Sequence, residues 1–226
     1  MVNMKNTMKK LLRSRRGMVG IEAAIVLIAF VIVAAAFSFM VVNMGLFSTQ
    51  RGRDTIQQGV REASTPLTLD GSITVRTDGG AGKVDAMIIP LKTMGTKYVA
   101  MWKNETVVSL RVANNAWANT YQGIAINTTA GGIQLDPTNK TYTQVITEIQ
   151  NSVTGTGAVL VIENSNGDEA LQHYEKGYLI VLLESGKEAQ ARDDVTVEIR
   201  PEKGAPLTVE LVVPEALPTE SYITVG

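Results

Sequence analysis

The chain has 226 residues, of which 45% are hydrophobic and 19% charged, with 21 basic and 22 acidic side chains. This composition is typical of folded proteins and excludes disorder of the whole chain, and the net charge of −1 argues against a general nucleic-acid binder. The absence of cysteine and the single histidine, His173, exclude disulfides, thiolate metal sites and most acid–base triads. We therefore expect no catalytic residue, no metal site and no cofactor, and predict that the chain is not an enzyme.

The first 17 residues form a basic head. By the positive-inside rule, a basic cluster in front of an apolar segment stays in the cytoplasm, which places the C-terminal part of the chain outside the membrane. The head has no acidic side chain, so the acidic excess lies in the rest of the chain. It holds six of the 21 basic side chains: Lys5, Lys9, Lys10, Arg13, Arg15 and Arg16.

The apolar segment that follows runs from Ile21 to Phe47, which exceeds the roughly 20 residues needed to cross a bilayer. Three fates are open for it. In the first, the segment is kept as a permanent membrane anchor. In the second, it is an ordinary secretory signal that ends at Ala34-Ala35-Ala36 and is cut before Phe37. In the third case the cut falls on the cytoplasmic side, between Gly17 and Met18, and the apolar helix is kept.

Two features favour the cut after Gly17. The apolar run continues well past Ala36, although a secretory signal ends near its cleavage site. Glu22 is a carboxylate within the apolar segment, where insertion costs about 2.5–3.5 kcal/mol, so a partner is expected. A new amine at Met18 would be four residues from Glu22, on the same side of a helix, and could pair with it in the same or a neighbouring copy. The alternative is a Glu22 that only contacts water at the membrane surface.

Residues 18–63 contain no proline and are predicted to form one helix, which Pro66 ends. A helix with such an apolar first half must bury itself in lipid or in other copies of itself. Gly45, Gly52 and Gly59 recur every seven residues and so share one side, where small residues let helices approach closely. The alternative is three unrelated glycines.

Residues 64–226 show the alternating apolar and polar pattern of β-strands. Leu67–Leu69 and Ser72–Val75, joined by Asp70-Gly71, predict a β-hairpin. Short strands without amphipathic helices between them favour an antiparallel β-sandwich over an α/β fold, and the chain as a whole is then α+β. Further strands are predicted at Val84–Leu91, Thr106–Val112, Ala158–Glu163, Tyr178–Glu184, Val195–Arg200 and Leu207–Val213.

Two other features are given structural interpretations. Asn164–Asp168, with Glu175 further on, has some likeness to a calcium-binding EF-hand loop, but Glu169 stands where that loop requires glycine. A turn between two strands explains the segment better. Trp102 and Trp117 could be exposed contacts between subunits, but packing in the core is the favoured interpretation.

A resemblance to a known family lies around the expected cut. The residues read Arg15-Arg16-Gly17, then Met18-Val19-Gly20-Ile21-Glu22 and the run AAIVLIAFVIVAA, and they resemble archaeal flagellins (archaellins), which belong to the type IV pilin-like superfamily. Asn43–Gln50 and Ser64–Val75 are also similar to that family. The resemblance implies removal of the leader by a prepilin-type peptidase, an immunoglobulin-like outer domain, and a helical homopolymer, the archaeal flagellum, assembled by a membrane motor for swimming.

The leader pattern is shared with archaeal adhesion pilins, so a subunit of an adhesion pilus is an alternative. A membrane-tethered surface binding protein is a further alternative, and it predicts monomers in the membrane with a ligand pocket. The resemblance implies an extracellular filament at the cell surface, with a precursor in the cytoplasmic membrane. It divides the chain into a leader at residues 1–17, a helix at 18–63 and a sandwich at 64–226.

Residues 113–144 are rich in asparagine, threonine, glycine and alanine, and are predicted to be irregular and exposed, or to form an extra strand pair. Three N-x-[ST] sequons fall in or near this region, at Asn104, Asn127 and Asn139. Archaellins are commonly N-glycosylated, so the resemblance implies glycans at these positions. The alternative is a loop in which asparagine and threonine are simply frequent.

Overall fold

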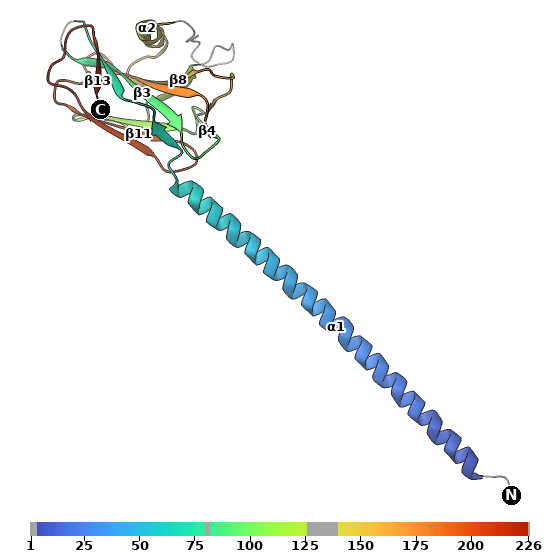
Figure 1. The fold of residues 1–226 in the computed structure, drawn as a ribbon. Helices are drawn as coiled ribbons and strands as arrows, with labels where there is room; N and C mark the ends of the chain where they lie inside the picture. Colours follow the sequence, from blue (N-terminus) through green and yellow to red (C-terminus); the bar gives the residue numbers. More distant parts are fainter. Residues whose placement is uncertain (1–3, 80–81, 126–139, 226) are drawn as a thin grey trace. The chain divides into compact units, whose positions relative to one another are not determined.

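The computed structural model describes residues 4–79, 82–125 and 140–225, with side chains from Val19 onward except that of Ala63 (Figure 1). The chain divides into two compact units, Met1–Gln58 and Gly59–Gly226. The described residues of the first unit all lie in a helix, and the second unit contains the β-sheets.

Helix α1 extends from Met4 to Ala63 as one continuous helix (Figure 1). Many of its residues are β-branched, but in an apolar environment a helix is favoured because it satisfies its backbone groups internally. At its end, Ser64 donates two hydrogen bonds to the carbonyl of Val60, from the backbone N–H (3.0 Å) and the hydroxyl (2.7 Å). Pro66 then prevents a further turn. The helix also includes most of the basic head, so no change of secondary structure marks Gly17.

Two sheets pack face to face in the second unit (Figure 1). The larger has the order β13-β2-β3-β10-β8-β7, with β1 also paired to β3, and the smaller has the order β12-β11-β5-β6. A third, two-stranded sheet pairs β4 with β9. The strands of the larger sheet are β1 (Leu67–Leu69), β2 (Ile73–Thr77), β3 (Val84–Thr93), β7 (Tyr121–Ala125), β8 (Gly157–Glu163), β10 (Lys176–Leu182) and β13 (Tyr222–Val225). The others are β4 (Tyr98–Ala100), β5 (Val107–Val112), β6 (Asn115–Trp117), β9 (Ala170–Gln172), β11 (Asp194–Arg200) and β12 (Leu207–Val212).

The main core lies between the two sheets. On β11 every second residue points into it, at Val195, Val197 and Ile199, while Thr196 and Glu198 between them are half-buried. The smaller sheet is therefore apolar on one face and polar on the other, as its alternating sequence predicts. A long N-terminal helix followed by a β-sandwich confirms the predicted α+β fold class.

The larger sheet is buried on both faces at its centre. Leu160 of β8 faces the main core, whereas Val159 and Val161 face a second apolar cluster beneath helix α2 (Tyr142–Ser152). Ile146 and Ile149 of α2 are fully buried in that cluster. Each such side chain contributes roughly 1.5–3 kcal/mol through burial, so α2 is an integral part of the fold.

The predicted hairpin at Asp70-Gly71 is wrong, because β1 and β2 both pair with β3. Leu69 lies opposite Leu91 and Thr74 opposite Ile88, so the chain makes an extra bend between two segments on the same edge of β3. A type I′ hairpin turn requires positive φ at both central residues. Gly71 has φ +132°, but Asp70 is not among the residues with positive φ.

The structure also corrects the expectation that no helix alternates with the strands. β7 is parallel to β8, and α2 lies between them in the sequence, so these three elements form one crossover unit. The region predicted as irregular or as an extra strand pair contains β6, β7 and the start of α2. Residues 126–139 of that region lie outside the described residues.

Candidate functional site

The most conspicuous surface of the chain is the apolar half of α1. Every large apolar side chain from Val19 to Phe47 is exposed, including consecutive ones such as Ile25, Val26, Leu27 and Ile28. Four consecutive residues point to all sides of a helix, so this segment is apolar around its whole circumference. Of the described residues, only Val19–Glu62 form a helix long and apolar enough to cross a membrane. Such a surface requires lipid or other protein on every side.

Glu22 lies within this apolar surface and is itself exposed. It borders a shallow groove on the helix that is also lined by Val19, Val26 and Phe30. Met18 precedes it by one turn in the continuous backbone of α1, and its side chain lies outside the described ones. The position of Glu22 therefore fits the predicted pairing with an amine, and the pairing itself stays a prediction.

Gly45, Gly52 and Gly59 lie on the exposed helix surface. A Cβ atom built at any of the three meets no atom of the chain within 4 Å. Nothing within the described chain therefore requires glycine at these positions, although each glycine costs a helix about 1 kcal/mol relative to alanine. The remaining structural reason is close packing against another molecule, which stays a prediction.

Of the three predicted glycosylation sites, one falls on described residues. Asn104 lies exposed in the turn after Trp102, and Thr106 of the same sequon is buried, with its hydroxyl 3.5 Å from the carbonyl oxygen of Ala100. A glycan on Asn104 would thus project into solvent from an ordered turn. Asn127 and Asn139 lie outside the described residues.

The loop that was compared with an EF-hand closes on its own backbone. The Glu175 carboxylate is buried and accepts the backbone N–H groups of Asn166 (3.2 Å) and Gln172 (2.9 Å). Asp168 accepts hydrogen bonds from the side chains of Asn166 (2.9 Å) and Gln172 (2.8 Å). Burial alone would raise the pKa of Asp168, but these bonds and one from the Ala170 backbone lower it. The carboxylates therefore order a turn, which agrees with the structural interpretation.

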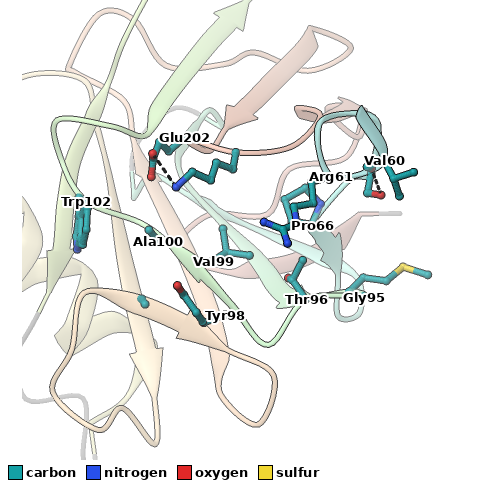
Figure 2. A pocket seen from close by; sticks show the side chains of 14 residues that line it. Val60, Arg61, Pro66, Gly95, Thr96, Tyr98, Val99, Ala100, Trp102 and Glu202 are labelled. Atoms are coloured by element: carbon teal, nitrogen blue, oxygen red, sulfur yellow. Dashed lines mark hydrogen bonds and ion pairs between the residues drawn. The ribbon is translucent and has the colours of Figure 1, made fainter. Parts of the chain in front are cut away.

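A pocket that the sequence did not reveal lies in the second unit. It has a volume of about 530 Å³, and we call it the Trp102 pocket (Figure 2). Trp102 was predicted to pack in the core, but 45% of it is exposed, so that prediction is wrong, whereas Trp117 does pack against the core as predicted. The pocket is lined by Val60, Arg61, Ser64, Pro66, Met94, Gly95, Thr96, Tyr98, Val99, Ala100, Trp102, Ala170, Glu202 and Lys203.

Exposed apolar side chains are concentrated at this pocket. Eight large apolar or aromatic residues are exposed among the described residues from Gly59 onward, and four of them line it: Val60, Met94, Tyr98 and Trp102. The lining comes from four separate stretches of the chain, at residues 60–66, 94–102, 170 and 202–203. No local sequence pattern could have brought them together.

Comparison with known proteins decides the family. The family model described as archaeal-type flagellin matches residues 17–211. This chain belongs to that family. Probable flagellin 1 of Aeropyrum pernix is 40% identical over 217 residues, which are 95% of this chain and 100% of the relative. Probable flagellin 2 of Archaeoglobus fulgidus is 30% identical over 95% of this chain and 98% of its own length.

Solved structures support the fold of this flagellin. The archaeal flagellum of Methanospirillum hungatei has a subunit with a TM-score of 0.52 and 22% identity, over 91% of this chain and 98% of that one. The crystal structure of an archaeal flagellin from Methanocaldococcus jannaschii has a TM-score of 0.53 over 70% of this chain and 95% of that one, with 17% identity. Membership of the family identifies this chain as a structural subunit of a motility filament at the cell surface, built from copies of itself.

Proposed function

We propose that this flagellin is made as a membrane-anchored precursor, is cut between Gly17 and Met18, and then polymerises through the helix that begins at Met18. The basic head keeps the N-terminus in the cytoplasm until a prepilin-type peptidase removes it. A membrane-bound motor then transfers the helix from lipid into the core of the growing filament. Assembly exchanges one apolar environment for another, so little hydrophobic penalty opposes it.

The observation that supports this proposal most strongly is the exposure of α1 on every side between Val19 and Phe47. An anchor that only tethers a domain has no need of a helix that continues to Ala63. A helix that serves first in lipid and then in a bundle needs an apolar surface all round, and lateral packing sites further along. The family match begins at Gly17, in agreement with a mature chain that starts at the next residue.

Within this sequence of events, single residues have distinct roles. The carboxylate of Glu22 pairs with the new amine of Met18, in the same copy or in a neighbour, and so removes an unpaired charge from the filament core. Gly45, Gly52 and Gly59 form the side on which neighbouring helices approach. The β-sandwich faces solvent and carries glycans at Asn104, Asn127 and Asn139.

We also propose that the chain acts as a structural subunit rather than as an enzyme. Its only histidine, His173, is exposed in the turn after β9, with its ring against Tyr174. Among the described residues, no three His, Asp or Glu side chains gather where they could hold a metal ion. The proposal needs no cofactor.

The experiment that tests this proposal separates cleavage from assembly. In cells that produce the Gly17→Leu variant, we expect the protein to keep its leader and to stay in the membrane fraction. Shearing these cells should release no filaments that sediment from the medium. Gly20→Leu, a matched control three residues further on, should still lose the leader. The proposal is wrong if Gly17→Leu is processed and sediments as filaments like the unmodified chain.

A further inference from the structure

The Trp102 pocket has an aromatic end that also carries a carboxylate, and a basic side chain lies towards its other end. Figure 2 shows Trp102 at one end, Glu202 beside it and Arg61 towards the opposite end. Tyr98 and Met94 on its rim are more than half exposed, at 61% and 62%. A solvent-exposed apolar concavity with aromatic walls is the kind of surface that binds an apolar side chain from another protein.

Acidic charge is concentrated next to the aromatic end. The backbone N–H of Glu105 donates to the carbonyl of Trp102 (3.2 Å), which holds Glu105 beside that residue. Desolvation and the adjacent carboxylate of Glu202 raise the pKa of Glu105 above its usual value, against the opposing effect of Lys203. The Lys203 ammonium lies 3.1 Å from Glu202. Glu202 is thus paired with Lys203, and Glu105 adds a second acidic side chain beside Trp102, so an arriving cation would reduce the repulsion between the two acidic groups.

Helix α1 carries a surface that is complementary to this pocket. The Arg51 guanidinium lies over the ring of Phe47, 4.6 Å from its centroid, and the two residues are one helical turn apart. Phe47 is exposed, and it marks the point where the apolar half of α1 gives way to the polar half. An aromatic ring followed by a cation matches a pocket in which Trp102 lies beside the carboxylate of Glu202, with Glu105 just outside the lining. Arg53 projects from the other side of the helix and is not part of this surface.

We propose that the Trp102 pocket receives the Phe47–Arg51 turn of α1 from a second copy of this chain. The Phe47 ring packs between Tyr98 and Trp102, and the Arg51 guanidinium binds the Glu105 and Glu202 carboxylates. This inference rests on the proposed function, because it presupposes a polymer held together by α1. Its physical basis is that open filaments form through contacts between two different surfaces of each copy, and the turn and the pocket are two such surfaces.

Charge reversal with rescue tests which surface fills the pocket. Filaments sheared from cells would be heated at a fixed temperature, and the rate of subunit release measured by sedimentation. We expect Arg51→Glu and Glu202→Arg each to release subunits about tenfold faster than the unmodified chain. The double variant should return towards the original rate, because the pair is restored with opposite charges.

The matched control is Arg53→Glu, which makes the same charge reversal at an arginine on the other side of the helix. Combining it with Glu202→Arg should give no rescue. If the Arg51→Glu, Glu202→Arg double variant is no more stable than either single variant, the inference is wrong. If the single variants form no filaments, recovery of filaments in the double variant is the supporting result and continued absence the contradicting one.

A second measurement does not depend on charge reversal. In a Trp117→Phe background, Trp102 is the only tryptophan, and its fluorescence quenching by acrylamide reports its exposure. We expect several-fold weaker quenching in filaments than in detergent-dispersed subunits. Equal quenching would mean that the pocket stays open and would overturn the inference. Protection of Trp102 without rescue by charge reversal would also overturn it, because a different surface would then cover the pocket.

These results are distinguishable from a failure of the proposed function. If the function is wrong, the unmodified chain gives no sedimenting filaments, or its mature form lacks α1. If only the docking inference is wrong, the unmodified chain gives filaments and starts at Met18, but either the rescue or the protection of Trp102 fails.

Discussion

Asp168 shows how a single carboxylate orders a loop of the outer domain. Its oxygens accept two side-chain hydrogen bonds and the backbone N–H of Ala170, and the turn before β9 is built around them. The neighbouring Glu175 performs the same task from the other end of the loop. A sequence rich in Asn, Gly and Asp therefore indicates a turn here because its polar side chains satisfy backbone groups that no strand partner reaches.

The lowered pKa of Asp168 makes this loop sensitive to acid. Because the folded-state pKa lies below the ordinary value of 3.8, the carboxylate stabilises the fold above that pH, and the stabilisation is lost as the pH falls through the lowered pKa. We expect Asp168→Asn to lower the free energy of unfolding at pH 7, with a difference from the unmodified chain that shrinks in stronger acid. Urea denaturation of the detergent-dispersed chain, at pH 7 and in stronger acid, measures this difference in the free energy of unfolding.

Glu169→Gln is the control for this prediction, because Glu169 is the exposed carboxylate next along the chain. It should change the stability less than Asp168→Asn at pH 7. If Asp168→Asn lowers the free energy of unfolding by the same amount at neutral pH and in strong acid, the charge of Asp168 does not contribute to the stability of the fold.

At the scale of elements, α2 is the part of the sandwich whose contribution is most easily isolated. Ile146→Ala removes a fully buried side chain between α2 and the larger sheet, and we expect a loss of about 2–5 kcal/mol in the free energy of unfolding. Thr147→Ala, at the exposed neighbouring position, should change it by no more than about 0.5 kcal/mol. Chemical denaturation of detergent-dispersed chain measures both, and equal effects would mean that α2 is not packed as described.

Most elements of the sandwich could be predicted because their information is local. Alternation at Val195, Val197 and Ile199 predicts β11 to within one residue of its observed start. The pairing of β1 and β2 with β3, and not with each other, could not be predicted in the same way. It depends on β3 being long enough to pair with both. Helix α2 was missed, although its capping box at Thr141 and Gln144 and the apolar spacing that follows are visible in the sequence.

The glycines of α1 give a prediction in which two effects have opposite signs. By helix propensity alone, Gly52→Ala stabilises the helix by about 1 kcal/mol. If neighbouring helices approach at Gly52, the added methyl group separates them, and filaments should release subunits faster on heating. Sedimentation after heating measures the release. Gln50→Ala, on the other side of the helix, is the control and should leave the rate nearly unchanged. Slower release from Gly52→Ala filaments would refute the packing role.

At the scale of the whole molecule, the sequence revealed the long apolar helix α1 but not the Trp102 pocket. The helix is a contiguous apolar run next to a basic head, so composition along the chain suffices to find it. The pocket needs the folded sandwich, because residues near 60, 100, 170 and 202 meet only there. Trp102 could not be assigned to core or surface from its neighbours, which is why the exposed position was not predicted.

The proposed function depends on the retention of α1 in the mature subunit, where it holds the filament together. N-terminal sequencing of the protein sheared from the cell surface tests it most directly. We expect a mature chain that starts at Met18, with the apolar helix intact. A start at Phe37 would mean that an ordinary secretory signal has been removed together with most of the apolar segment, and would contradict assembly through this helix.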